Sequence, residues 1–254
     1  MPLKRLRVLI VLGVVLTGLA APSHAQQAVV GKWALGGTFN YNVPTFGLSS
    51  WYGNTPKWGV NFTYVTSQRT SVELEFNHSR DPNGSLVART FNWPIDEKNY
   101  LSPDASATMT WNNFAVNGLI RLTAGPVFES ERYAPYLTVG AGFYRYSSKT
   151  SGLVWPGQSK TVTGAASLNN PNPGPDRSLM IPAAEDSKPA LSFNMGLGLE
   201  AFITSNISLD VRTRYHLSIA ELRPVNAYGL KQTFPLQQLD IGGGLKFYFK
   251  PQVR

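Results

Sequence analysis

The stretch SFNMGLGLE, residues 192–200, decides the fold of this chain. Phe193, Met195, Leu197 and Leu199 alternate there with small or polar residues. An alternation with a period of two is typical of a β-strand that has one apolar face and one small or polar face. The fold then depends on which of these two faces meets the interior of the protein.

Seven further segments show the same alternation, at residues 32–41, 58–64, 71–78, 113–122, 135–144, 207–216 and 238–249. Each is about as long as a tilted strand that crosses a membrane. The connections at 66–70, 123–132 and 204–206 are short or moderate, whereas those near 42–57, 79–110, 147–190 and 217–237 are longer. Long loops at one end and short turns at the other are typical of outer-membrane barrels. We therefore predict an all-β fold, an eight-stranded antiparallel transmembrane up-and-down β-barrel.

The apolar face of these strands is predicted to face lipid. An eight-stranded barrel leaves an interior just wide enough for side chains to fill it, and eight rows of bulky apolar residues would overfill it. A soluble secreted barrel with the apolar face inside is the alternative, but it leaves the unequal loop lengths unexplained. Aromatic residues near the predicted strand ends resemble the girdles at the two membrane interfaces, and these are Trp33, Tyr41, Trp58, Tyr64, Tyr215 and Phe249.

Charged residues on the other face are then predicted to lie in the lumen. They are Glu73, Glu75, Glu200, Asp210 and Asp240 against Arg121, Arg212, Arg214 and Lys246. Buried charges need partners, so these groups either hold the interior closed or line a narrow pore. We favour the structural role because the lumen is narrow. A three-residue loop centred on Asn206 would place Glu200 directly opposite Arg212.

The first 25 residues are predicted to be a secretory signal peptide, and residues 26–254 the barrel domain. A basic start at Lys4, Arg5 and Arg7 precedes an apolar run that ends before the small-x-small site at 23–25. That run is too short for a membrane-spanning helix. Without these three cations, 20 Lys and Arg face 15 Asp and Glu, a net charge of +5. The charges are scattered, so no nucleic-acid partner is expected.

Two stretches carry a family resemblance, PYLTVGAGFY at 135–144 and FNMGLGLEAFITSNISLDVRTRYH at 193–216. They resemble the small outer-membrane β-barrel proteins, the outer-membrane protein A-like and W-like barrels. The resemblance implies a bacterial outer-membrane protein, embedded in lipid, that is structural, adhesive or a narrow diffusion pore. The W-like members are associated with passage of small apolar solutes.

The resemblance also implies that the last strand is read by the barrel-assembly machinery. The matching residues are Ile241, Gly243, Leu245, Phe247 and Phe249, although the chain continues through residues 250–254.

One candidate for catalysis is the pair His216 and Ser218, since lipid A deacylases are small outer-membrane barrels with a His-x-Ser pair. A His beside a Ser can activate the hydroxyl when a carboxylate orients the imidazole, and Glu221 is the nearest downstream acid. Ile219 stands where that family has Asn, and the expected third acid is missing. His78 and Ser79 point to opposite faces of a strand. We therefore predict no enzymatic activity.

No cofactor or metal site is expected, because the chain has no Cys, two His outside the predicted signal and no phosphate-binding motif. The remaining candidate is a surface ligand at the outer loops, where Trp93 and Trp155 each precede a Pro. We favour the alternative that these tryptophans pack the long loops in place or dip into the lipid interface, since an exposed aromatic is only suggestive of a ligand. The sequence thus predicts a monomeric structural or surface-interaction protein, with a narrow pore for small solutes and, more remotely, a lipid A deacylase as alternatives.

Overall fold

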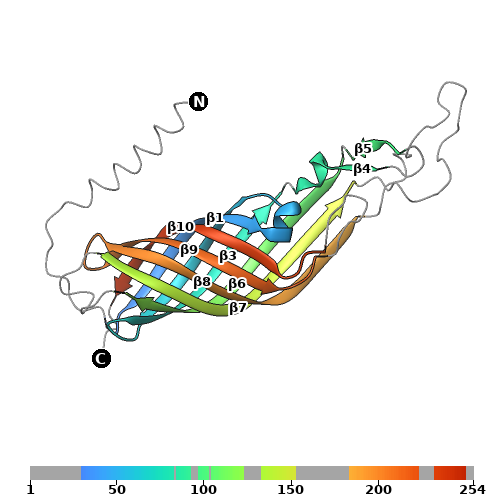
Figure 1. The fold of residues 1–254 in the computed structure, drawn as a ribbon. Coiled ribbons are helices and arrows are strands. Elements are labelled where there is room, and N and C mark those ends of the chain that lie inside the picture. Colours follow the sequence, from blue (N-terminus) through green and yellow to red (C-terminus); the bar gives the residue numbers. More distant parts are fainter. Residues whose placement is uncertain are drawn as a thin grey trace, which may run out of the picture.

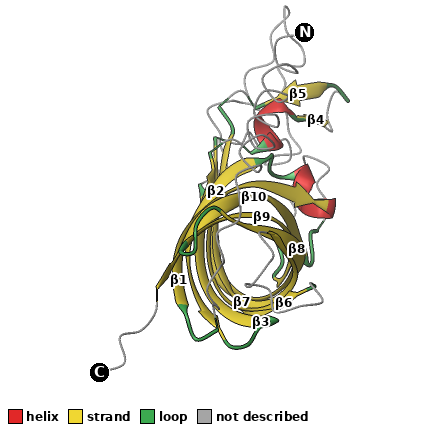
Figure 2. Ribbon diagram, turned by 90° about the vertical axis from the view of Figure 1, so that its left-hand side faces the viewer, coloured by secondary structure: helices red, strands yellow, loops and turns green. Residues whose placement is uncertain are grey.

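A computed structural model shows a closed antiparallel barrel of eight strands, drawn in Figure 1 and seen nearly end-on in Figure 2. The structure describes residues 30–82, 84–92, 97–102, 104–122, 133–152, 183–222 and 232–249. The barrel strands are β1 (Trp33–Thr45), β2 (Thr55–Val65), β3 (Thr70–Asp81), β6 (Ser106–Arg121), β7 (Tyr133–Ser151), β8 (Ala184–Phe202), β9 (Ile207–Ile219) and β10 (Leu236–Phe249). Each strand pairs with its sequence neighbours, and β10 closes onto β1. The predicted fold class is confirmed.

The pairing register fixes the tilt of the strands. Successive partners lead from Leu35 on β1 around all eight strands and return to Thr45 on β1, ten residues farther along. With about 3.3 Å between residues and about 4.8 Å between strands, this offset tilts the strands by about 40° and gives a backbone radius of about 8 Å. Such a lumen holds side chains and little else.

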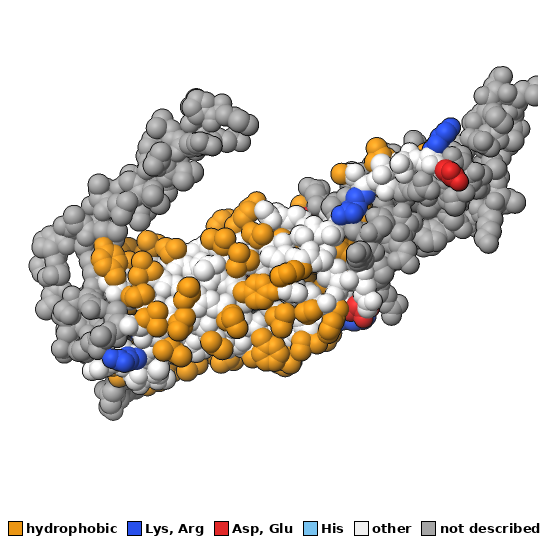
Figure 3. Space-filling model, viewed as in Figure 1, with side chains coloured by type: hydrophobic (Ala, Val, Ile, Leu, Met, Phe, Trp, Pro, Cys, Tyr) orange, Lys and Arg blue, Asp and Glu red, His pale blue; other side chains and the backbone are white. Residues whose placement is uncertain are grey.

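The faces of the strands answer the question raised by residues 192–200. Phe193, Met195, Leu197 and Leu199 are exposed on the outside of the barrel, whereas Asn194 and Glu200 are buried inside. The outward apolar residues of all eight strands form a band. Figure 3 shows part of it on one face of the barrel, as orange side chains among white atoms. On β7 this band runs from Pro135 to Phe143, about 20 Å along the barrel axis at the tilt derived above. That height fits the hydrocarbon layer of an outer membrane.

Several strands extend beyond this band, so the predicted loops were too long. β1 continues to Thr45 and β2 starts at Thr55, which leaves 46–54 as the connection instead of 42–57. The other three connections shorten to 82–105, 152–183 and 220–235. Above the band the apolar residues lie on the inner face instead of the outer face, as Met109 and Trp111 do on β6, so the outward apolar pattern of the membrane band does not extend to these strand ends.

The long connections carry small elements of their own at one end of the barrel. These are the 3-10 helices η2 (Phe46–Ser50) and η3 (Ser85–Ala88), and a two-stranded sheet of β4 (Thr90–Asn92) and β5 (Asn99–Leu101). We call this the loop end, and the opposite end, where Trp33 pairs with Phe249, the turn end. Within the described ranges, no helix is long and apolar enough to cross a membrane.

The pairing observed in the β8–β9 hairpin differs from the predicted one. Glu200 pairs with Asp210, and Arg212 pairs with Gly198. The turn has three residues, as expected, but it is centred on Ser205 instead of Asn206, because Ile203 and Thr204 both donate their backbone N–H to the carbonyl of Ile207. The even offset keeps Glu200 and Arg212 on the inner face, two residues apart in register.

Candidate functional site: a closed lumen

The middle of the lumen is occupied by charged side chains. All nine predicted lumen charges are buried inside the barrel. Lys57 is buried there as well, although it is not among the predicted lumen charges, because it lies just before the strand predicted to begin at Trp58. With Lys32 and Asp81 included, six basic and six acidic side chains are buried among the described residues. The lumen is therefore electrically balanced.

Glu73 is the centre of this arrangement. Its carboxylate lies 2.6 Å from Arg214 Nη2, 3.1 Å from Arg212 Nη1 and 3.2 Å from Lys246 Nζ. Arg214 also contacts Glu75, and Arg212 Nη2 lies 2.6 Å from Asp210 Oδ2. The partners come from β3, β9 and β10, so the network spans the lumen instead of following one wall. We call this group the charge belt.

A second group of ion pairs lies on the loop-end side of the charge belt. Lys57 Nζ lies 2.6 Å from Asp240 Oδ2 and donates to the Tyr144 hydroxyl at 3.0 Å. His216 Nε2 lies 2.9 Å from the same Asp240 oxygen, and its ring meets that of Tyr144 edge-on. β2, β7, β9 and β10 are thereby joined across the lumen.

The turn end is closed by a third group, around Glu200. Ser208 donates to this carboxylate at 2.5 Å, Tyr248 donates to it as well, and Arg121 Nη2 lies 3.5 Å away. The Tyr248 ring packs on Phe202 within a small apolar cluster that also holds Ala34, Val65 and Ala134. Buried aromatic and aliphatic side chains therefore close the lumen on this side of the charges.

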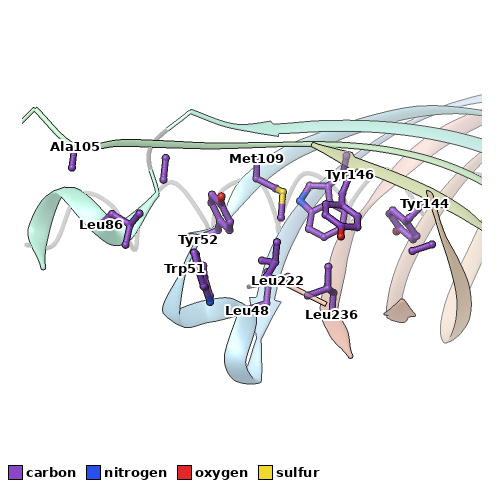
Figure 4. Packing of buried hydrophobic residues seen from close by; sticks show 13 residues of the cluster. Leu48, Trp51, Tyr52, Leu86, Ala105, Met109, Tyr144, Tyr146, Leu222 and Leu236 are labelled. Carbon is purple, nitrogen blue, oxygen red and sulfur yellow. The ribbon is translucent and has the colours of Figure 1, made fainter. Parts of the chain in front are cut away.

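The loop end is closed by a larger apolar cluster, shown in Figure 4. We call it the outer plug, and its buried members are Leu48, Trp51, Tyr52, Leu86, Ala105, Ala107, Met109, Trp111, Tyr144, Tyr146, Ala190, Leu222 and Leu236. The segment around η2 contributes Leu48, Trp51 and Tyr52, which lie against inward residues of the barrel wall. Above the apolar band the faces of the wall are therefore reversed, with apolar residues inside.

Polar contacts hold Tyr52 in this plug. Its hydroxyl lies 2.6 Å from Ser148 Oγ on β7. Burial of the side chain raises the pKa of Tyr52 to about 12. The outer plug is not among the predicted features, because residues 42–57 are predicted to form a loop. The stretch FGLSSWY at 46–52 has four large apolar side chains in seven positions, and this density is the sequence signal for the plug.

The candidate catalytic residues do not form a triad. His216 and Ser218 are both buried on the inner face, and among the described contacts none joins His216 to Ser218 or Glu221. Glu221 instead accepts a hydrogen bond from Gln232 at 2.6 Å. His78 faces outward while Ser79 is buried, as expected from their adjacent positions.

The six predicted girdle aromatics lie at both edges of the apolar band. Trp33, Tyr64 and Phe249 meet at the turn end, where Trp33 stands opposite the other two in register. Tyr41, Trp58 and Tyr215 lie toward the loop end. The five predicted assembly residues all lie on the outward face of β10, within the apolar band. Trp93, Trp155, the predicted signal peptide and residues 250–254 lie outside the described residues.

The family assignment rests on a sequence match over nearly the whole chain. A sequence model of the outer membrane protein beta-barrel domain family matches residues 11–249. The chain belongs to this family. This outer-membrane barrel is therefore a protein of the bacterial outer membrane, and its apolar band is in contact with membrane lipid.

Solved structures with similar folds have very different sequences. The attachment invasion locus protein Ail of Yersinia pestis is 11% identical, with a TM-score of 0.47 over 87% of this chain and 99% of that one. OprG of Pseudomonas aeruginosa is 10% identical, with a TM-score of 0.45 over 90% and 100%. AlkL, determined in lipid bilayers, is 14% identical, with a TM-score of 0.41 over 92% and 97%. No curated protein matches this chain.

Proposed function

We propose that this outer-membrane barrel is a non-catalytic, non-conducting protein that acts as a structural and surface-interaction protein through its loop end. The observation that carries the proposal is the filling of the lumen at four successive levels, from the group around Glu200 through the charge belt and the ion pairs of Asp240 to the outer plug. A water-filled channel would leave its lining side chains exposed to solvent, yet Glu73, Glu200 and Asp210 are each 0% exposed. The ion pairs of Glu73 join β3 to Arg212 and Arg214 on β9, which is the opposite wall of the barrel, so an ion could pass only by breaking them.

The loop end supports the second half of the proposal. The outer plug gives this end a small apolar core of its own, above the apolar band. A folded core can hold connecting loops in fixed positions, and binding residues are often found on loops that a rigid scaffold positions. The four long connections all emerge at this end, which faces the cell exterior in a barrel with short periplasmic turns.

Binding to immobilised targets tests this proposal on whole cells. Cells that present the full chain are compared with cells that present a variant in which residues 153–182 are replaced by a short Gly-Ser linker. The targets are a panel of polysaccharides and extracellular-matrix proteins, and heat-dependent gel mobility checks that both barrels are folded. We expect retention of cells that carry the full chain and its loss with the variant. Equal retention of both, or none with the full chain, would contradict the proposal.

A further inference from the structure

Two arginines stand on the outside of the barrel where the apolar band ends. Arg80 on β3 and Arg145 on β7 are both exposed. Arg80 pairs with Thr110 on β6, and Arg145 pairs with Asn112 two residues away on the same strand. This diagonal across β6 separates their Cα atoms by about 12 Å. Two extended guanidinium groups can therefore approach one another over β6.

A row of polar and aromatic side chains lies beside the two arginines. Trp58, His78, Asn112 and Arg145 are successive partners across β2, β3, β6 and β7. His78 Nδ1 lies 2.8 Å from Asn112 Oδ1, and its ring lies 5.3 Å from that of Trp58. The result is a short polar row with an aromatic ring at one end and a guanidinium at the other.

Directly below this row lies an apolar one. Phe76, Phe114 and Phe143 are partners on β3, β6 and β7, two residues nearer to the turn end than His78, Asn112 and Arg145, respectively. All three phenylalanines are exposed on the membrane-facing side. This part of the wall thus has an apolar surface below and polar and cationic groups above. A membrane lipid has its acyl chains and its headgroup in the same order.

The cationic groups are confined to this side of the barrel. At the same height, the outward residues on β8, β9, β10 and β1 are Leu191, Ile219, Gln237 and Val43, none of which is charged. Neither Arg80 nor Arg145 lies within ion-pair distance of an acidic side chain in the described part of the chain, and Arg145 acts only from farther away on the exposed Glu185, whose pKa it helps to lower. An anion between the two guanidinium groups would be attracted by both of them.

We infer that Arg80 and Arg145, with Asn112 and His78, form a binding site for the phosphate group of an outer-leaflet lipid headgroup, whose acyl chains lie on Phe76, Phe114 and Phe143. Arginine is suited to phosphate because its planar fork donates two parallel hydrogen bonds. Trp58 can pack its ring on the sugar or glycerol portion of the headgroup, as interfacial tryptophans do. The lipid is chosen over a soluble phosphate because the phenylalanine row continues the site into the membrane band.

The test measures lipid retention by native mass spectrometry on the refolded full chain in detergent. The probes are a diphosphorylated lipid A, the same lipid without its phosphates, and soluble glucosamine 1-phosphate. The variants are the pair R80Q and R145Q combined, and K149Q as the control. Lys149 is a good control because it also faces outward on β7, but lies above the site and is paired with Glu185 at 3.2 Å. Heat-dependent gel mobility reports folding of each variant.

We expect wild type and K149Q to retain the phosphorylated lipid with equal affinity, and the double arginine variant to bind it about tenfold or more weakly. The lipid without phosphates should bind all three proteins as weakly as the phosphorylated lipid binds the double arginine variant. Equal retention of both lipids by wild type, unchanged binding by the folded double variant, or an equal loss in K149Q would overturn the site. Binding of glucosamine 1-phosphate as strong as that of the lipid would overturn the assignment to a membrane lipid. Arginine variants that fail to fold are replaced by R80K and R145K, which keep the charge but remove the fork; unchanged affinity in these would refute the bidentate contact.

Discussion

Replacement of Glu73 by Gln should destabilise the barrel more than any other single loss of charge in the lumen. The carboxylate contacts Arg212, Arg214 and Lys246 within 3.2 Å and is completely buried. The amide keeps the volume but removes the negative charge, so three buried cations are left with fewer partners. Removal of one member of a buried ion pair costs about 3–5 kcal/mol. We expect a loss of that size in the free energy of unfolding.

The assay is equilibrium unfolding in urea of the barrel in lipid vesicles, followed by tryptophan fluorescence and heat-dependent gel mobility. Glu185→Gln is the matched control, because Glu185 is an exposed carboxylate at the loop end that is paired with Lys149. Exposed pairs contribute little to stability, so this variant should unfold with wild type. The reasoning is refuted if folded Glu73→Gln unfolds within about 1 kcal/mol of wild type, or if both variants lose the same amount.

Three further predictions concern other parts of the lumen. Gly142→Ala should cost about 2–3 kcal/mol, because its Cβ would lie 2.1 Å from the Phe114 carbonyl oxygen, whereas Gly37→Ala, with nothing within 4 Å, should be nearly neutral in the same urea titration. The Tyr52 hydroxyl should titrate near pH 12, and Tyr52→Phe should reduce the rise in absorbance at 295 nm in that pH range by the contribution of one tyrosine; because the folded pKa is raised, its contribution to stability is full below pH 10 and is lost as the pH rises through 12. Trp51→Ala should cost about 3 kcal/mol by leaving a cavity in the outer plug, yet planar bilayers should stay silent because the charge belt remains closed; ion channels in this variant would count against the belt as a seal.

The barrel could be predicted from the sequence because its strands obey one simple rule inside the membrane. Lipid selects apolar residues for one face and a narrow lumen selects small or charged ones for the other. Successive residues of a strand point to opposite faces, so their alternation alone places Glu73 and Arg212 inside. The alternation does not show which residues of neighbouring strands pair with each other. The β8–β9 turn is centred on Ser205, one residue before the predicted centre at Asn206. Asp210 instead of Arg212 therefore lies opposite Glu200.

The loop end could not be predicted, because the rule reverses there. Above the membrane the outer face meets water and becomes polar, as at Lys149, while the inner face packs Tyr146 and Met109 into the outer plug. The alternation continues with opposite meaning, and no sequence marker shows where the change occurs. Lys57 was not predicted to lie in the lumen because it comes one residue before the predicted strand at 58–64, whereas β2 begins at Thr55.

The most direct test of the closed lumen is planar-bilayer conductance of the refolded full chain, with heat-dependent gel mobility to show that the inserted protein is folded. A variant with Glu73, Arg212 and Lys246 all replaced by Ser serves as a comparison, because it removes three ion-paired side chains from the charge belt. We predict that the folded wild-type barrel gives no discrete openings. Reproducible single-channel steps in wild type that change in size in the triple variant would contradict the account and make the charge belt the lining of a pore.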